Sequence, residues 1–178
     1  MTCDDLVQEK IRNFDAKVDK LLQLDFGKAD LVVAIPNLWI DVISMADLEE
    51  VSNFQRMKTS KRIRVATKYP NLTNSFFSNR GVVDYRTVES HGSTESAPFN
   101  GFADIISDIT STGQTLKANN LRVLDDGLIL KSSAAIFKSK FFGTFVRRFS
   151  DIIAFSLKVV TQPALIFLPF HKYFGVAL

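Results

Sequence analysis

One short polar segment of this sequence combines the residue types that bind a phosphate group. In ADIISDITSTGQTLKANN, residues 103–120, an apolar run leads into a Ser-Thr-Gly turn and then into a short helix expected from Thr115. Gly113 permits close approach of the backbone, so consecutive amides can point at one phosphate near the positive end of that helix. We expect Asp108, just before the turn, to accept hydrogen bonds from neighbouring sugar hydroxyls. The turn also offers four hydroxyl groups, from Thr110, Ser111, Thr112 and Thr115.

The same turn has a second interpretation. Turns of this kind are common connections between a strand and a helix, in which Thr110 or Thr112 caps the helix and no ligand is involved. Lys117 is equally compatible with a solvated position on the helix. The turn alone does not choose between the two interpretations, so its surroundings in the chain decide.

The elements around the turn alternate between strands and helices. LVVAIP, residues 31–36, is typical of a strand buried on both faces that stops at Pro36. Ser44 with Asp47 resembles a capping signal for a short helix. This alternation is typical of an α/β layer. The predicted helices are 4–22, 45–51 and 71–79; the other predicted strands are 63–66, 82–88, 103–109 and a two-part run, 121–130, broken at Asp125, Asp126 and Gly127.

Composition excludes several classes of protein. The chain has 178 residues, of which 46% are hydrophobic and 23% charged, so it is neither disordered nor of low complexity. The 22 Lys and Arg residues exceed the 19 Asp and Glu residues by only three, and this small excess does not indicate nucleic-acid binding. Cys3 is the only cysteine, which excludes an internal disulfide and a cysteine metal cluster.

Neither end of the chain favours a membrane location. The first seventeen residues, MTCDDLVQEKIRNFDAK, lack the apolar core of a secretory signal. The apolar stretch 152–170 includes Lys158, Gln162 and two prolines, which disfavours a spanning helix. The region beyond Lys131 contains nine of the sixteen Phe residues, several on one helical face. That pattern predicts a core-facing amphipathic helix, with a partner-binding face, a membrane-surface helix or an altered chain end as alternatives.

Several ordered blocks of the sequence together carry a family resemblance. LDFGKADLVVAIPNLWIDVISMADLEEV, RIRVATKYPNLTNSFFSNRGV, TVESHGSTESAPFNGFADIISDITSTGQTLKANNL and LDDGLILKSSAAI resemble successive segments of the ATP phosphoribosyltransferase family, short form, over about residues 4–138. The resemblance implies an α/β fold of two lobes, like a type II periplasmic binding protein, with the first lobe incomplete. It assigns 1–35 to the first lobe, 36–130 to the second lobe, and 131–178 to the return to the first lobe followed by a Phe-rich helix or tail.

The resemblance also implies a reaction and its site. The family performs the first step of histidine biosynthesis, in which the phosphoribosyl group of phosphoribosyl pyrophosphate is transferred to N1 of ATP with release of pyrophosphate. By this resemblance Asp108 is the catalytic residue and holds the ribose hydroxyls, and Mg²⁺ is bound through the substrate with no direct protein ligand. Lys68 follows a predicted strand at the crevice side of the sheet, so it is either a phosphate contact or a surface lysine. The expected substrate-binding residues are Thr110, Ser111, Thr112, Gly113, Gln114 and Thr115 on the 5′-phosphate, and Gly92, Ser93 and Thr94 on the other phosphates.

The resemblance implies partners, and the sequence departs from it in one place. The short form works in the cytoplasm with a regulatory subunit that resembles histidyl-tRNA synthetase, so we expect a hetero-oligomer or a homodimer, with no nucleic acid and no membrane partner. The family's opening turn of Pro-Lys-Gly-Arg type, which helps to bind nucleotide, is not found in this sequence. The alternative function is therefore a truncated, non-catalytic module that binds phosphate or nucleotide with the same fold.

Overall fold

The computed structural model describes residues 2–11, 13–90 and 92–140. Residues 1–139 form one compact unit, to which the following description applies. The predicted Phe-rich helix and the apolar stretch 152–170 lie outside the described residues. Within the described residues, no helix combines the length and the hydropathy that crossing a membrane requires.

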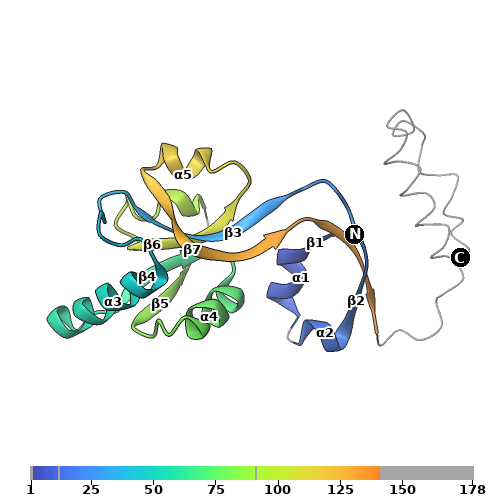
Figure 1. The fold of residues 1–178 in the computed structure, drawn as a ribbon, viewed down its shortest axis with the longest axis horizontal. Helices are drawn as coiled ribbons and strands as arrows, with labels where there is room; N and C mark the ends of the chain where they lie inside the picture. Colours follow the sequence, from blue (N-terminus) through green and yellow to red (C-terminus); the bar gives the residue numbers. More distant parts are fainter. Residues whose placement is uncertain (1, 12, 91, 141–178) are drawn as a thin grey trace, which may run out of the picture. The chain divides into compact units, whose positions relative to one another are not determined.

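A five-stranded mixed sheet carries most of the described residues, with the strand order β5-β4-β6-β3-β7 (Figure 1). β4 runs parallel to both β5 and β6, whereas β3 is antiparallel to β6 and to β7. The strands are β3 (Ala29–Pro36), β4 (Ile63–Thr67), β5 (Tyr85–Glu89), β6 (Ile105–Thr110) and β7 (Leu121–Ser132). The alternation of strands and helices thus folds into the predicted α/β layer.

Helices cover both faces of this sheet. α3 (Met45–Thr59) and α4 (Pro70–Asn79) lie on one face, and α5 (Gln114–Ala118) lies on the other (Figure 1). Side chains of β3 alternate between two buried clusters, with Val33 in the first and Val32 in the second. The prediction that this strand is buried on both faces is confirmed.

A smaller three-stranded sheet has the order β1-β8-β2. It consists of β1 (Thr2–Cys3), β2 (Val18–Gln23) and β8 (Ala134–Ser139), and α1 (Asp4–Lys10) and α2 (Phe14–Lys17) lie between β1 and β2 in the sequence. The prediction of one helix over 4–22 is wrong in its second half. Asn13 takes a left-handed conformation, φ +55°, which interrupts the helix, and residues 18–23 pair with β8. Pairing with a distant strand therefore overrides the local helical pattern.

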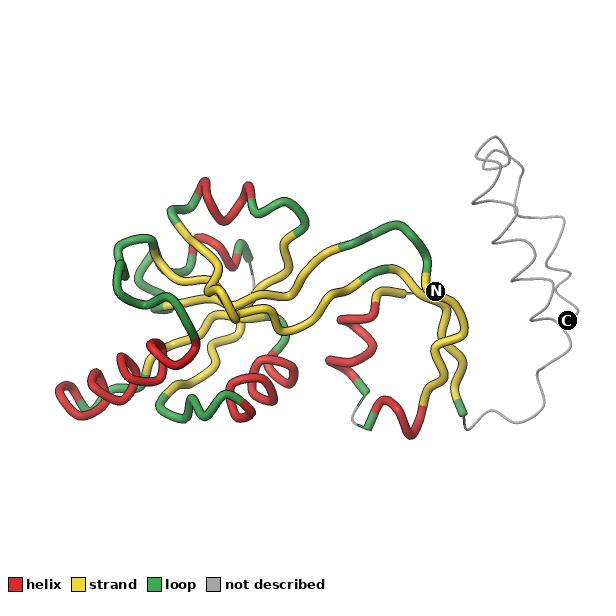
Figure 2. The backbone as a smooth tube through the Cα atoms, in the orientation of Figure 1, coloured by secondary structure: helices red, strands yellow, loops and turns green. Residues whose placement is uncertain are grey.

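Two long strands connect the sheets. β3 and β7 pair with one another in the five-stranded sheet. A loop, residues 24–28, joins β2 to β3, and one residue separates β7 from β8, as the strands and loops of Figure 2 show. The predicted break at Asp125, Asp126 and Gly127 is a change of register inside the continuous strand β7. A Cβ at Gly127 would lie 2.9 Å from the Leu124 Cβ and 3.1 Å from the Val33 carbonyl oxygen, so a larger residue does not fit there. The domain limits at 35 and 130 stay predictions.

The start of α3 confirms the predicted capping signal. The Ser44 side chain accepts the Asp47 amide at 3.3 Å, and the Asp47 carboxylate accepts the Ser44 amide at 2.7 Å, which together make a capping box. The helix is longer than the predicted 45–51, since it runs to Thr59 and is terminated by Ser60, which has φ +56°.

Candidate active site

The carboxyl ends of three parallel strands meet in one row. The register pairs Thr67 of β4 with Glu89 of β5 and with Ser107 of β6. Lys68 and the loop residues 90 and 92–98 follow the ends of β4 and β5, and Asp108 comes directly after Ser107 within β6, so these segments lie at the same edge. Ligands of open α/β sheets bind at this edge, so the structure gathers these predicted segments where a site is expected.

Asp108 is the buried carboxylate of this edge, with 9% of its surface exposed. Burial raises the pKa of its carboxyl group, while hydrogen bonds from the Ile109 amide, at 2.9 Å, and from the Thr94 hydroxyl lower it. The charge of Lys68 also lowers this pKa, and that of Glu95 raises it. Three predicted site residues, Asp108, Thr94 and Lys68, are thus close enough to interact. The carboxylate has oxygen atoms that can accept hydrogen bonds from hydroxyls or from water on a cation.

Lys68 supplies the positive charge at this edge. Its side chain is exposed, and it makes no salt bridge with the residues that the structure describes. An ammonium group whose charge reaches Asp108, and which has no carboxylate partner among the described residues, is suited to neutralise a phosphate.

The turn after Asp108 combines both interpretations of its sequence. The Thr110 hydroxyl accepts the Gly113 amide at 2.9 Å, so this amide is engaged within the turn, and the Gln114 amide makes a long contact of 3.4 Å with the Thr112 hydroxyl. Gly113 has φ +70° and has open space where a Cβ would stand, so backbone conformation, not crowding, requires glycine. Three amides have no acceptor among the described residues, those of Ser111, Thr112 and Thr115.

The second predicted loop divides into exposed and buried parts. Gly92 and Ser93 are exposed, and the Ser93 hydroxyl donates to the Glu95 carboxylate at 3.0 Å. Thr94 begins the short helix η1 (Thr94–Ser96) and is fully buried, with its hydroxyl 3.2 Å from the Ser90 hydroxyl. Burial limits Thr94 to shaping the loop and Asp108, whereas Gly92 and Ser93 are accessible to a ligand.

Two acidic residues near the start of the chain approach the same edge, and the sequence did not identify them. The Tyr69 hydroxyl donates to the Asp5 carboxylate at 2.9 Å, and burial, then this bond, raises the pKa of Tyr69. The Glu9 carboxylate accepts the amides of Asn71 and Leu72 at 3.0 and 2.9 Å and so caps α4, whose first residues have no cap of their own. In the sequence, both residues occupy positions typical of the solvated polar face of a helix. Their partners are more than sixty positions away, so local spacing does not indicate these contacts.

The donor set fits Mg²⁺ held mainly by substrate. Among the described residues, no three His, Cys, Asp or Glu side chains are grouped to hold a metal. Asp108 offers one carboxylate, and Mg²⁺ in phosphate-binding enzymes takes one or two carboxylates, several waters and the substrate phosphates.

Comparison with known proteins gives the family. The sequence matches the family model HisG: ATP phosphoribosyltransferase over residues 1–153. ATP phosphoribosyltransferases of Rhodopseudomonas palustris (strain BisA53) and of Chelativorans sp. (strain BNC1) are 54% and 53% identical to it over 140 and 141 residues. Each alignment covers 79% of this chain, but 43% of the first protein and 61% of the second, so the chain spans about half the length of these relatives.

Solved structures agree with this assignment. The ATP phosphoribosyltransferase (HisG:HisZ) complex of Thermotoga maritima contains a chain that matches with a TM-score of 0.60 and 25% identity, over 89% of this chain and 66% of that one. The arginine-bound form of truncated ArgBP from T. maritima matches with a TM-score of 0.51 and 14% identity, over 85% and 62%. The second similarity shows the fold alone and confirms the α/β architecture of the periplasmic-binding-protein type. From the family match and the identity to these relatives, the chain belongs to the ATP phosphoribosyltransferase family.

Proposed function

We propose that this chain provides the phosphoribosyl pyrophosphate site of an ATP phosphoribosyltransferase and takes part in the first step of histidine biosynthesis. The observation that carries the proposal is the cluster of Asp108, Lys68 and Thr94 at the carboxyl edge of parallel strands, with the Ser-Thr-Gly turn beginning three residues after Asp108. A buried carboxylate, an unpaired ammonium group and unengaged turn amides together suit a phosphorylated pentose better than any of them alone.

The reaction places charge where these groups lie. As N1 of the ATP adenine attacks the anomeric carbon, pyrophosphate leaves, and positive charge develops on the ribose ring while negative charge develops on the leaving group. The Asp108 carboxylate accepts hydrogen bonds from the ribose hydroxyls and stabilises the ring charge, and Lys68 neutralises phosphate. The amides of Ser111, Thr112 and Thr115 hold the 5′-phosphate, which orients the ribose for attack.

The remaining parts of the site complete this assignment. Gly92 and Ser93, the exposed residues of the second loop, contact the other phosphates. Thr94 is buried and shapes the loop that carries them. When bound, Mg²⁺ neutralises the pyrophosphate and makes it a better leaving group. Asp108 is the residue of this chain placed to reach the hydration shell of that ion.

Assembly follows the related complex. The T. maritima neighbour is a HisG:HisZ complex, and we propose that this chain likewise works in the cytoplasm with a regulatory subunit that resembles histidyl-tRNA synthetase. ATP binding is proposed for the same assembly.

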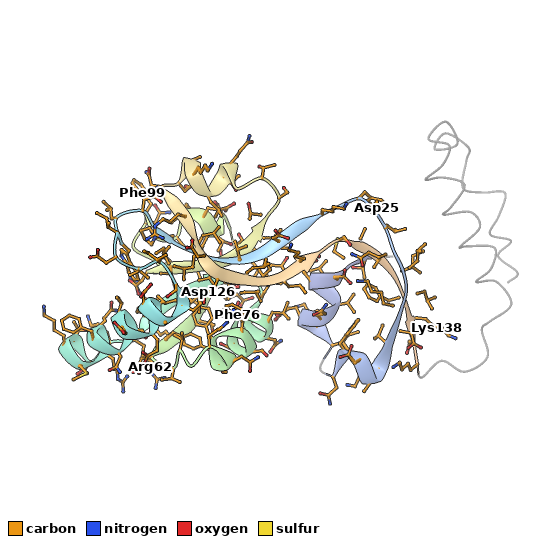
Figure 3. All side chains as sticks on the ribbon, viewed as in Figure 1. Asp25, Arg62, Phe76, Phe99, Asp126 and Lys138 are labelled. Carbon is orange, nitrogen blue, oxygen red and sulfur yellow. The ribbon has the colours of Figure 1, made fainter. Side chains whose placement is uncertain are left out.

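Calorimetry tests the binding step directly. We expect phosphoribosyl pyrophosphate with Mg²⁺ to bind the whole chain, and Asp108→Asn, which keeps the shape of the side chain but removes its charge, to weaken binding at least tenfold. Asp25→Asn is the matched control, because Asp25 lies on the segment between β2 and β3 and its side chain is fully exposed (Figure 3). Absence of binding to the unaltered chain, or equal binding by both variants, would contradict the proposal.

An activity assay separates the enzyme from a binding module. Formation of N1-(5-phosphoribosyl)-ATP is followed by absorbance with and without the regulatory subunit. Turnover that depends on Asp108 supports the transferase. Binding of phosphoribosyl pyrophosphate without turnover under both conditions would show a non-catalytic module instead.

A further inference from the structure

Three hydroxyl groups are buried together just behind the proposed site. Thr67 at the end of β4, Thr73 in α4 and Ser107 in β6 have 1%, 0% and 0% of their surface exposed. Their neighbours on this face of the sheet are apolar, among them Val65, Ile105 and Phe77. A hydroxyl group buried in such surroundings is unfavourable unless it is hydrogen-bonded, so the three must satisfy one another.

The hydroxyl groups form one directed chain. The Tyr69 amide donates to the Thr67 hydroxyl at 2.9 Å, and the Thr73 hydroxyl donates to that of Ser107 at 2.9 Å. Thr67 and Thr73 are joined by a contact of 3.3 Å. Because a hydroxyl has one proton and that of Thr73 goes to Ser107, Thr67 is the donor in this contact. The chain therefore runs from Tyr69 through Thr67 and Thr73 to Ser107.

Thr73 is the one member that comes from outside the sheet. Thr67 and Ser107 are partners in the parallel register of β4 and β6, so their side chains lie on the same face. The Thr73 hydroxyl contacts both from α4, and so ties the end of β4 to the middle of β6. Lys68 and Asp108 are the next residues after Thr67 and Ser107.

We propose that Thr73 is a positioning residue, whose hydroxyl fixes the end of β4 against Ser107 of β6 so that the next residues, Lys68 and Asp108, are held at the spacing that one phosphoribosyl pyrophosphate molecule requires. The proposal rests on the function proposed above. Thr73 itself is fully buried and touches no ligand, so its effect on binding passes through its two neighbours.

Substitutions at Thr73 distinguish positioning from simple support of the fold. Thr73→Val keeps the branched shape but leaves the Thr67 proton and the Ser107 oxygen without their partner. Thr73→Ser keeps the hydroxyl group and loses a methyl group. Ser52→Ala is the matched control, because the Ser52 hydroxyl is 1% exposed and donates to the Glu49 carbonyl at 2.7 Å within α3.

Calorimetric titration with phosphoribosyl pyrophosphate and Mg²⁺, combined with thermal unfolding, provides the first test. We expect Thr73→Val to weaken binding about tenfold, and Thr73→Ser to stay within about twofold of the unaltered chain. Ser52→Ala should lower thermal stability without changing affinity. Unchanged affinity in Thr73→Val, with or without a loss of stability, would overturn the proposal. Should Thr73→Val not fold, Ser107→Ala replaces it with the same expectation, because it removes the hydroxyl group that accepts the hydrogen bond of Thr73.

A second readout needs no substrate. NMR on the whole chain measures the titration midpoint of the Asp108 carboxyl group. Burial raises the pKa of this group, the Ile109 amide and the Thr94 hydroxyl lower it, and among the nearby charges Lys68 lowers it while Glu95 raises it. Movement of the β4 end away from β6 weakens the effect of Lys68, so we expect a higher midpoint in Thr73→Val and restoration in Thr73→Ser. An unchanged midpoint overturns the positioning role even if the unaltered chain binds substrate. If the midpoint rises in Thr73→Val but the unaltered chain binds no substrate, the proposed function is contradicted, whereas the positioning of β4 and β6 by Thr73 is supported.

Discussion

The two sheets of this protein are held together by different forces. All the largest fully buried side chains among the described residues belong to the five-stranded sheet, its helices and its loops. The region of the three-stranded sheet and α1 buries smaller apolar side chains together with three acids, Asp4, Asp5 and Glu9, each with a hydrogen-bonding or charged partner. The first region thus depends mainly on removing apolar surface from water, and the second depends in addition on satisfying a few buried acids.

This difference has a consequence for how each region responds to change. Loss of an apolar side chain leaves a cavity, and its effect is large and largely independent of pH. Loss of one partner in a buried polar contact leaves the other partner without a hydrogen bond, and it weakens the packing of the two elements that the contact joins. The Oδ1 atom of the Asp4 carboxylate has no hydrogen-bond partner within the described part of the chain, although Lys20 contacts Oδ2 at 2.9 Å. The polar region is therefore the one that we expect to open first.

The largest expected effect is in the apolar region, at Phe77. This side chain is fully buried in the core under α4, with its ring centroid 4.7 Å from that of Tyr85. We expect Phe77→Ala to lower the free energy of unfolding by about 3–5 kcal/mol, measured by urea denaturation. Phe54→Ala, on the exposed face of α3, should change it by less than about 0.5 kcal/mol. Equal effects of the two substitutions would show that the apolar core is not what holds this region.

Glu9 tests the polar region. Glu9→Ala removes the acceptor of two α4 amides, so we expect a loss of about 1–3 kcal/mol, and a smaller loss for Glu9→Gln, which keeps one carbonyl oxygen. Hydrogen exchange should become faster at the amides of Asn71 and Leu72 while β3 stays protected. Gln8→Ala is the control. Exchange that accelerates throughout the five-stranded sheet would contradict the division into two differently stabilised regions.

Asp108 is the exception, a buried acid inside the apolar region. Burial raises its pKa in the folded state above the value of the unfolded chain, so the folded protein holds the proton more tightly. As pH rises from about 4 through the raised pKa, the unaltered chain should therefore lose stability, and Asp108→Asn should lack this loss. Thermal unfolding of both proteins between pH 4 and pH 8 measures the difference. A variant less stable than the unaltered chain at neutral pH would show that Asp108 stabilises the fold, not the ligand.

Local patterns predicted the apolar region and missed the polar one. The β-branched run of β3 and the Ser44 and Asp47 signal act within a few residues, so the sequence predicted both. Residues 18–23 form a strand because β8, more than a hundred positions later, pairs with them. The helical spacing of the first residues carries no trace of that pairing.

The same limit applies to the candidate site. Thr94 and Lys68 both act on the pKa of Asp108, and Lys68 and Asp108 lie close to the ends of strands that the sequence identified, whereas their role in a site stays a prediction. The hydroxyl group of Thr73 could have been suspected, since it lies four positions before Phe77 on the apolar side of a predicted helix. Asp5 and Glu9 could not, because only the folded chain brings them to Tyr69 and α4.

The smallest expected effect comes from an exposed polar contact in the apolar region. The amides of Ser44 and Ile43, followed by the Ser44 hydroxyl, lower the pKa of Asp47, whose carboxylate accepts all three hydrogen bonds. Its stabilisation is thus present above the unfolded value of 3.8 and is lost as pH falls through the lowered folded pKa. Asp47→Asn should be slightly less stable than the unaltered chain at pH 7 and equal to it in strong acid, by thermal unfolding. If Asp47→Asn cost as much as Glu9→Ala, burial would not be what makes polar contacts matter in this protein.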